Sequence, residues 1–459
     1  MSGHRQRVAV VGGGLAGITA ALHAADAGFT VELFESTPRL GGLTHSFKRG
    51  ERWVDNGQHV FLRCCTRYRA LLNRLDVAHL VRLQPRLDIT VRDGDRVGRL
   101  NRSVLPAPLH LATALARYPW LSMQQTALLA RAALLLRNVD ADDPRNDAQT
   151  FGAWLRRHGQ RPGTIDAVWD LIGIATLNCR AEDASLAAAA TVFQLGLLSD
   201  RTAADIGWST VPLQRLHGDA ATAALESAGV TIQLRNKVRS LAREGEGWLL
   251  GNGGASGAQR YDAVVLAVPP DAAEQLLPSG AVSLSSGWAA GLGCAPIVNV
   301  HAVFDRPVLD EPFVATVGSP AQWIFDRTEI AGEKRGQYLA VSVSAAGEFV
   351  GMTNAQLRQL FLPELSRILP RARSATVLDF FVTRERCATF RPVPGTAALR
   401  PQARTALPGL YLAGAWTATG WPATMESAVR SGESAAAALV EEWGGTSMGR
   451  RRIREVALS

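Results

Sequence analysis

The chain has 459 residues, of which 47% are hydrophobic and 20% charged, and its net charge is +8. This composition is that of a folded globular protein of about two or three domains, and it excludes a disordered or fibrous chain. The positive charge permits contact with nucleic acid or with an anionic membrane surface. No motif that reads RNA or DNA occurs, so we expect no nucleic-acid partner.

The five cysteines are odd in number and scattered, with no C-x-x-C pair. They predict neither a disulfide framework nor a zinc site, and we expect no metal. Residues 1–7 are too short and polar for a secretory leader. Glycines and prolines interrupt the long uncharged stretches 275–304 and 405–425, so neither predicts a membrane-spanning helix. We therefore expect a cytoplasmic protein, with peripheral association at the inner face of the membrane left open.

The chain starts with an apolar strand, a glycine-rich turn and a helix. Val8–Val11 predicts a buried parallel strand, and residues 18–27 predict an alanine-rich helix. Between them, Gly12, Gly14 and Gly17 fall at the G-x-G-x-x-G spacing. Gly12 permits the tight turn, Gly14 lets the backbone approach a pyrophosphate, and Gly17 lets the helix pack on the strand. The helix N-terminus offers N–H groups to the phosphates.

A second strand is expected over residues 30–34, ending at Glu35. A carboxylate at that place accepts hydrogen bonds from a ribose hydroxyl. Arg39 and the pair Gly41-Gly42 follow, as a turn whose backbone can lie against a cofactor. The stretch thus predicts a dinucleotide site, without by itself deciding between NAD and FAD.

Polar residues then interrupt an apolar stretch at 53–60, which contains Asp55 and His59 and is typical of a loop facing a site. Residues 67–83 predict a helix. Residues 87–100 predict two short strands that turn at Asp93-Gly94, and 140–149 predict a loop.

Two long segments, 106–137 and 165–198, are predicted to be largely helical and are unusually apolar. An apolar helix pair can be the core of a large domain. It can instead line a lipid-sized cavity or dip into a membrane interface. The sequence leaves both interpretations open.

The second half of the chain predicts strands of two sheets. Residues 261–270 form a buried run stopped by two prolines, typical of a parallel strand, and 251–257 is a hairpin turn between 240–250 and 260–268. Further strands are expected at 230–234, 297–304, 338–344 and 376–383, with a helix over 354–369.

Near the end, a strand over 409–416 contains Gly414 and precedes a helix over 423–443. A strand, a glycine and a helix N-terminus therefore meet a second time. An NAD dehydrogenase has no use for a second cofactor-wrapping segment, so the combination favours FAD. The arginine-rich residues 450–454 predict a basic, disordered tail.

With these motifs, the whole chain resembles the FAD-dependent amine oxidase and phytoene desaturase superfamily. Within it, the chain is similar to the hydroxysqualene dehydroxylases, also called squalene-associated FAD-dependent desaturases, of bacterial hopanoid pathways. The narrower resemblance rests on the sequences at 55–61 and 421–426 and on Leu177-Asn178 with Glu182.

The resemblance implies FAD as the cofactor and names the residues that would bind it. Relatives often have an acidic residue where Ala415 stands, and its side chain can contact the ribityl chain or the phosphates. In this chain that contact is absent, so backbone N–H groups would have to replace it. The implied FAD contacts are Gly12, Gly14, Leu15, Ala16, Gly17, Glu35, Arg39, Gly41, Gly42, Val238, Gly414, Ala415, Met425, Glu426 and Ala428.

The fold class expected is α/β with an α+β second domain, in which a Rossmann-like FAD-binding domain is interleaved with a substrate domain of mixed sheet and apolar helices. The FAD-binding domain would comprise residues 1–85, 206–285 and 391–445. The substrate domain would comprise 86–205, mostly helical, and 286–390, mostly sheet, and 446–459 would be the basic tail.

The resemblance implies reductive dehydroxylation of hydroxysqualene, a long apolar isoprenoid, to squalene, with hydride from N5 of reduced FAD and loss of water. The sequence does not specify the electron donor. His59 and Asp55 are the candidate proton donors to the leaving hydroxyl.

Three alternatives stand beside this function. One is a polyprenyl or carotenoid-type desaturase, in which electrons run from substrate to flavin. Another is a prenyl-lipid escort protein, which shares the fold without using a flavin. An amine oxidase is the third, and it is disfavoured because the alanine- and leucine-rich chamber does not suggest an aromatic cage.

Overall fold

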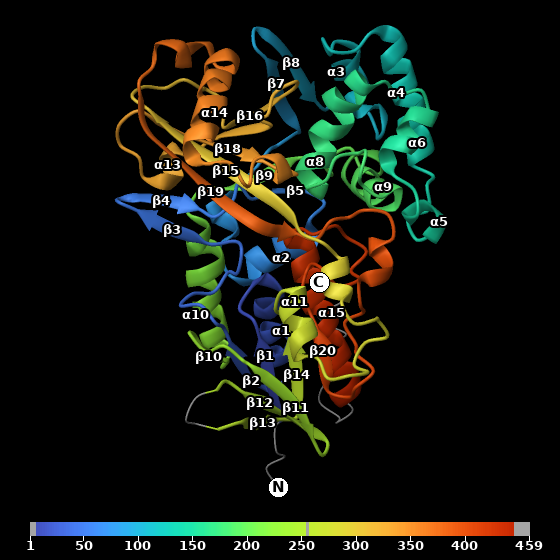
Figure 1. Ribbon diagram of the computed structural model, residues 1–459, viewed down its shortest axis with the longest axis vertical. Helices are drawn as coiled ribbons and strands as arrows, with labels where there is room; N and C mark the ends of the chain where they lie inside the picture. Colours follow the sequence, from blue (N-terminus) through green and yellow to red (C-terminus); the bar gives the residue numbers. More distant parts are fainter. Residues whose placement is uncertain (1–5, 254–256, 445–459) are drawn as a thin grey trace.

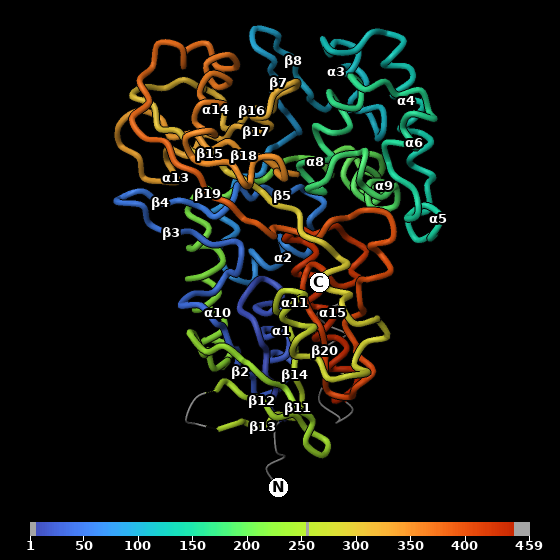
Figure 2. Tube along the Cα trace, in the orientation of Figure 1, coloured from blue at the N-terminus to red at the C-terminus, as the bar shows by residue number. Residues whose placement is uncertain are grey.

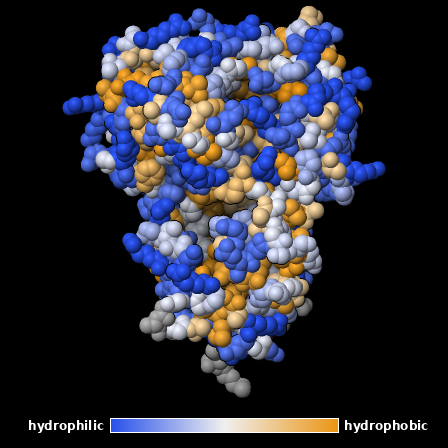
Figure 3. All heavy atoms as spheres, viewed as in Figure 1, coloured by the Kyte–Doolittle hydropathy of each residue, from blue (hydrophilic) through white to orange (hydrophobic). Residues whose placement is uncertain are grey.

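The computed structural model of the protein describes residues 6–253 and 257–444. The molecule is elongated, with a parallel sheet and its helices in the lower half of Figure 1 and a larger, mainly antiparallel sheet with a helical group above. The same chain path in Figure 2 crosses between the halves several times. The space-filling view is hollowed at the waist where the halves meet (Figure 3).

The lower half is built on a five-stranded parallel sheet of order β10-β2-β1-β14-β20. Its central strands are apolar and buried, as parallel strands covered on both faces are. The strands are β1 (Arg7–Val11), β2 (Thr30–Phe34), β10 (Thr231–Gln233), β14 (Ala263–Leu266) and β20 (Leu410–Leu412).

One face of this sheet is covered by α1 (Leu15–Asp26) and α15 (Met425–Trp443), with α10 (Ala220–Ser227) alongside. The first two helices pack closely because Gly432 lies where a Cβ would approach Ala16 O within 2.3 Å. A small sheet of β11 (Ser240–Glu244), β12 (Gly247–Gly251) and β13 (Gln259–Tyr261) belongs to the apolar cluster on the other face.

The upper half contains a seven-stranded sheet of order β19-β15-β18-β17-β16-β7-β8. Helix α14 (Asn354–Ile368) covers one of its faces through Leu357, Phe361 and Leu365. The strands are β7 (Asp88–Asp93), β8 (Arg96–Asn101), β15 (Ala295–Phe304), β16 (Phe313–Thr316), β17 (Trp323–Asp326), β18 (Gln337–Val343) and β19 (Val377–Thr389).

The helical group beside this sheet shares an apolar cluster with it, to which β7, β8, β16 and β17 contribute. It contains α3 (Ala112–Ala116), α4 (Met123–Leu136), α6 (Phe151–Arg157), α8 (Leu171–Leu177) and α9 (Leu186–Phe193). Between the halves lie α2 (Thr66–Arg74), a hairpin of β3 (Ser46–Arg49) and β4 (Arg52–Asp55), and a small sheet of β5 (Val60–Leu62), β6 (Val81–Leu83) and β9 (Ile206–Ser209).

The mixed α/β fold class is confirmed. The parallel sheet draws its strands from all three segments expected for the FAD-binding domain, and the seven-stranded sheet draws them from both segments expected for the substrate domain. This supports the interleaved boundaries as a proposal. The predicted tail, 446–459, lies outside the described residues.

Several local predictions were wrong. The helix expected over 67–83 ends at Arg74, because Asp76 has a left-handed backbone with φ 56°, and the chain continues as β6. The loop expected over 140–149 contains the short helix α5 (Pro144–Asp147). The strand expected over 240–250 is two strands that turn at Gly245.

The expectation of no disulfide was also wrong, because Cys294 and Cys387 are bonded with their Cα atoms 4.8 Å apart. The two residues are 93 positions apart in sequence. They meet because β15 and β19 pair side by side, with Ala295 opposite Thr389. A proximity of this kind depends on the sheet pairing and cannot be seen in the spacing of cysteines.

Candidate functional site

The first part of the site is the turn between β1 and α1. Gly12 has φ +112°, and a Cβ there would lie 2.3 Å from Ala267 O. A Cβ on Gly17 would lie 1.9 Å from Gly12 O. Both positions therefore exclude a side chain, which brings the end of β1 and the start of α1 together as expected from the spacing.

The N-terminus of α1 is open toward a ligand. Gly14 is its N-cap residue, and neither a capping side chain nor an acidic residue occupies the first turn, where Leu15 and Ala16 are buried. Across from it, Gly42 packs so closely that a Cβ there would be 3.0 Å from Gly14 Cα. N–H groups at such a helix end attract phosphate oxygens.

Glu35 lies beside this turn at the end of β2. Its carboxylate accepts hydrogen bonds from the N–H groups of Gly13 at 2.8 Å and Thr37 at 2.7 Å. The segment before Val238 lies next to Glu35, because Asn236 N donates a hydrogen bond to Glu35 O at 2.9 Å. Glu35 and Val238, 203 residues apart by their numbers, are thus brought to one edge of the parallel sheet.

The loop after Glu35 continues along the turn. Gly41 N donates to Gly13 O at 2.9 Å, and both Gly41 and Gly42 have positive φ. In the same loop, Arg39 Nε is a buried donor without a hydrogen-bond partner among the described residues. A buried cationic donor of this kind calls for an acceptor. The cradle of glycines, the open helix end and this donor fit a bound dinucleotide such as FAD.

The C-terminal segment completes the cradle. Gly414, with φ +145°, follows β20 and donates its N–H to Ser431 Oγ on α15 at 2.8 Å. Ala415 O accepts from Ser427 Oγ at 3.2 Å. Met425 and Ala428 lie in the first turn of α15 and pack on the cluster around α1.

A residue that the sequence did not single out holds this segment in place. Arg400 donates to the carbonyls of Ala415, Thr417 and Trp421 and to the Thr419 hydroxyl. Burial lowers its pKa to about 10. Nothing in the local sequence distinguishes Arg400 from the neighbouring arginines, since its acceptors come from a later loop.

Glu426, expected to contact the cofactor, directs its carboxylate elsewhere. It accepts from the N–H groups of Arg67 at 3.2 Å and Tyr68 at 2.8 Å, and from Arg430 Nε at 2.7 Å. It therefore caps α2, whose own N-cap residue supplies no side-chain hydrogen bond. Only the backbone of Glu426 stays a candidate for cofactor contact.

Asp55, a candidate proton donor, lies at the waist and is buried. Oδ1 accepts from Ser46 Oγ at 2.5 Å and from Leu213 N at 3.1 Å. Oδ2 forms an ion pair with the buried Arg327 of the upper half. With these contacts the Asp55 side chain joins the two halves of the molecule, and we therefore expect it to have a structural role in place of proton donation.

His59, the other candidate, lies in the loop between β4 and β5. Its Nδ1 is 3.1 Å from Gly57 O, which fixes the proton on Nδ1 because a carbonyl only accepts. Burial lowers the pKa of His59 below its ordinary value. At neutral pH the ring is therefore uncharged, and its Nε2 is an acceptor.

Aromatic side chains gather on the face of the large sheet opposite α14. Trp208 and Phe313 have ring centroids 5.5 Å apart, and Phe313 lies 6.0 Å from Trp323. These rings form an aromatic wall that comes from β9 of the small sheet and from β16 and β17 of the large sheet. They meet only in the folded protein, so the sequence did not indicate the wall. Among residues 6–253 and 257–444, no cluster of potential metal ligands occurs.

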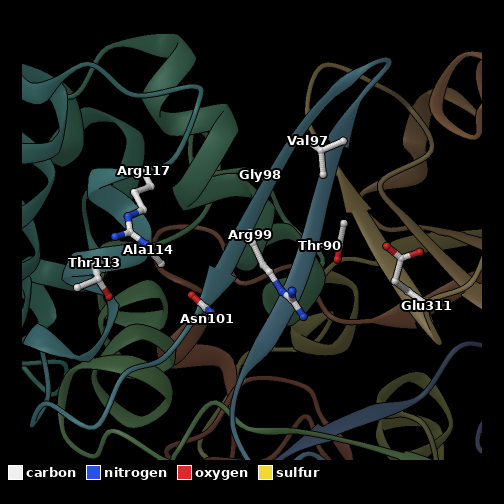
Figure 4. A pocket seen from close by; sticks show the side chains of 9 residues that line it. All are labelled: Thr90, Val97, Gly98, Arg99, Asn101, Thr113, Ala114, Arg117 and Glu311. Carbon is white, nitrogen blue, oxygen red and sulfur yellow. The ribbon is translucent and has the colours of Figure 1, made fainter.

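A separate surface groove lies between the β7–β8 hairpin and α3 (Figure 4). One of its two arginines, Arg99, is paired with Asp88 at 2.5 Å. The groove contains none of the predicted site residues. It is lined by Thr90, Val97, Gly98, Arg99, Asn101, Thr113, Ala114, Arg117 and Glu311.

Known proteins resemble the chain over nearly its full length. The sequence profile of a family described as "flavin containing amine oxidoreductase" matches residues 15–440. Hydroxysqualene dehydroxylase of Sinorhizobium fredii is 28% identical over 95% of this chain and 99% of its own length. A probable zeta-carotene desaturase of Synechococcus elongatus is 24% identical over 95% of this chain and 98% of its own. Among solved structures, cyclohexylamine oxidase from Brevibacterium oxydans has a TM-score of 0.70 at 20% identity, covering 96% and 100% of the two chains.

Proposed function

Because the chain belongs to the flavin containing amine oxidoreductase family and is thus an FAD-dependent oxidoreductase, we propose that it reduces hydroxysqualene to squalene. The observation that carries the proposal is the full-length similarity to hydroxysqualene dehydroxylases, joined to an FAD cradle whose glycines and Arg39 converge. Family membership and this cradle also favour an enzyme over an escort protein.

The reaction converts an alcohol, a hydride and a proton into a hydrocarbon and water, and reduced FAD supplies the hydride when bound. The chain has three tasks. The cradle holds the cofactor, the aromatic and apolar wall excludes water and packs on the isoprenoid, and polar groups at the waist orient the hydroxyl. Orientation of the reacting groups supplies much of the rate in such a step.

His59 stays the candidate for proton delivery. We expect His59→Ala to retain bound FAD and to lose most turnover. Since burial lowers the pKa of His59, its acid form accumulates only below the pH range in which an ordinary histidine titrates. If His59 is the acid, kcat/KM of the wild type rises as pH falls through this lowered pKa. Near-normal turnover of His59→Ala, or the same rise in the variant, would remove His59 from this role.

The second candidate is a carotenoid-type desaturase, which the zeta-carotene desaturases among the relatives favour. The two functions differ in electron direction. We expect purified holoenzyme, reduced under anaerobic conditions, to form squalene from hydroxysqualene. Oxidised enzyme that desaturates a carotenoid precursor, and forms no squalene when reduced, would favour the second candidate.

We further propose that the isoprenoid reaches the enzyme from a membrane surface. Helix α4 buries Leu129 and Leu136, yet its opposite side exposes Met123 at 92% and Leu134 at 52%. Before α3, Val104 is 81% exposed. The exposed arginines nearby are Arg117, Arg131 and Arg137. Exposed apolar side chains together with exposed arginines on and beside the same helix fit the interface of an anionic bilayer. Among the described helices, none is long and apolar enough to cross a bilayer.

The prediction is that the double variant Met123→Asp/Leu134→Asp loses at least about tenfold in affinity for vesicles of phosphatidylglycerol and phosphatidylcholine, since each change places a charge in the interface. Co-sedimentation with vesicles measures the effect. Leu378→Asp is the matched control, because Leu378 is also exposed, at 54%, but lies on β19. An equal loss of vesicle affinity in the double variant and in Leu378→Asp, or no loss of affinity in either, would contradict the proposed surface.

A further inference from the structure

Strand β15 has two faces with different surroundings. Val298, Val300 and Ala302 point into the apolar cluster beneath α14. The alternate residues Asn299 and His301 therefore point to the opposite face. Val303, on that same face, packs with Val54 of β4, so this side of the sheet is turned toward the waist.

The strand register places polar and aromatic residues in rows across this face. Asn299 is opposite Ser342 on β18 and Thr383 on β19, and Ser342 is opposite Trp323 on β17. The next row contains His301, opposite Ala340 and Phe381. Asn299 and Trp323 of the aromatic wall thus lie in one row, with Ser342 between them.

A second polar residue with a long side chain on this face, His301, has its hydrogen bonds satisfied. His301 Nδ1 lies 2.7 Å from Tyr338 Oη, and His301 Nε2 lies 3.1 Å from Thr383 Oγ1. Its ring also stacks on Phe381 at 4.4 Å. His301 therefore has no nitrogen left for a ligand.

Asn299 differs from His301 in this respect. Its side chain has 0% exposure, and its Nδ2 donates to Asn56 O at 3.4 Å. Its Oδ1 is buried without a hydrogen-bond partner among the described residues. A buried acceptor without a donor is unfavourable and calls for a missing group.

Asn299 is connected through hydrogen bonds to the loop that follows Gly42. Asn56, which holds its Nδ2, is itself bound to the loop that follows Gly42, because Asn56 N donates to His45 O at 2.9 Å and Asn56 Nδ2 to Leu43 O at 3.2 Å. Asn299 is thus fixed at the junction between the substrate sheet and the loop expected along the cofactor.

We propose that Asn299 Oδ1 accepts the hydrogen bond of the substrate hydroxyl and so selects an isoprenoid alcohol over the corresponding hydrocarbon. The inference rests on the proposed function and names its specificity-determining residue. The hydroxyl would sit at the polar row of Asn299, and the apolar chain would lie on the aromatic wall. Asn299 acts here by binding and orientation, with no proton transferred.

The experiment compares binding to the oxidised holoenzyme, which lacks the reducing equivalents for turnover. Titration with hydroxysqualene and with squalene in detergent, followed by flavin absorbance changes and by tryptophan fluorescence, gives the ratio of the two Kd values. We expect Asn299→Leu, which fills the same space without an acceptor, to reduce the preference for the alcohol about tenfold while squalene affinity stays unchanged. Asn299→Ala serves as a second variant if the leucine variant does not fold.

Val300→Ala is the matched control, since it is the next residue of the strand on the other face, and we expect it to keep the wild-type ratio. The proposal is overturned if both Asn299 variants keep that ratio, or if they lose FAD in parallel with the alcohol. The proposed function is judged separately by the wild type. If reduced wild-type enzyme forms no squalene and the oxidised form does not prefer the alcohol, the function fails and the inference falls with it.

Discussion

Asp55→Ala is expected to destabilise the protein by about 3 kcal/mol, because it leaves the guanidinium of Arg327 buried and unpaired. It also removes the acceptor of the Ser46 hydroxyl and of Leu213 N–H. The measurement is urea unfolding of the FAD-loaded protein, in which the midpoint should fall while the slope stays constant.

A double-mutant cycle separates the ion pair from the other contacts of Asp55. Asp55→Ala/Arg327→Ala should be more stable than the sum of the two single losses predicts, because the second change removes the unpaired charge. If Asp55→Ala keeps wild-type stability yet abolishes turnover, Asp55 is the proton donor after all and the structural assignment is wrong.

The second large effect is expected for Gly14→Val, which should lower FAD affinity by at least about 100-fold, because the backbone there must approach a pyrophosphate closely. The variant should still fold. Gly14 has an extended backbone with φ −77°, and the nearest atom to a Cβ there is Gly42 Cα at 3.8 Å. FAD titration by quenching of flavin fluorescence measures the affinity, and thermal unfolding of the FAD-free protein checks the fold.

Gly163→Ala is the matched control for this variant. No atom lies within 4 Å of a Cβ at Gly163, whose φ is not positive, and the residue lies in α7 (Pro162–Thr164), outside the cradle. It should bind FAD as the wild type does. Wild-type FAD affinity in Gly14→Val would mean that the phosphates do not lie at the start of α1.

The sequence predicted best those features that depend on neighbouring residues. Residues 30–34 are the strand β2, and the helix expected over 354–369 is α14, which begins with a capping box between Thr353 and Gln356. Such elements are set by local periodicity and capping. The helix expected over 67–83 failed because a left-handed residue, Asp76, ends it without a glycine or proline to indicate the break.

For the site, the motif at the start of the chain predicted the tight glycine turn between β1 and α1, but the sequence did not predict which partners the polar side chains of the site have. Asp55 and Glu426 are two examples, and their place beside a bound cofactor stays a prediction. The Asp55 carboxylate pairs with Arg327, 272 residues away. The Glu426 carboxylate accepts a hydrogen bond from the backbone of α2, 358 residues away. Arg400 and Asn299 were missed for the same reason, since their partners are supplied by the tertiary fold.

The most direct test of the account is product analysis by gas chromatography and mass spectrometry. Purified FAD-loaded enzyme is reduced without oxygen and incubated with hydroxysqualene, beside the same protein left oxidised. We predict squalene in amounts that match the flavin oxidised, and none from the oxidised protein. Recovery of unchanged hydroxysqualene, with the flavin still reduced, would contradict the proposed reaction.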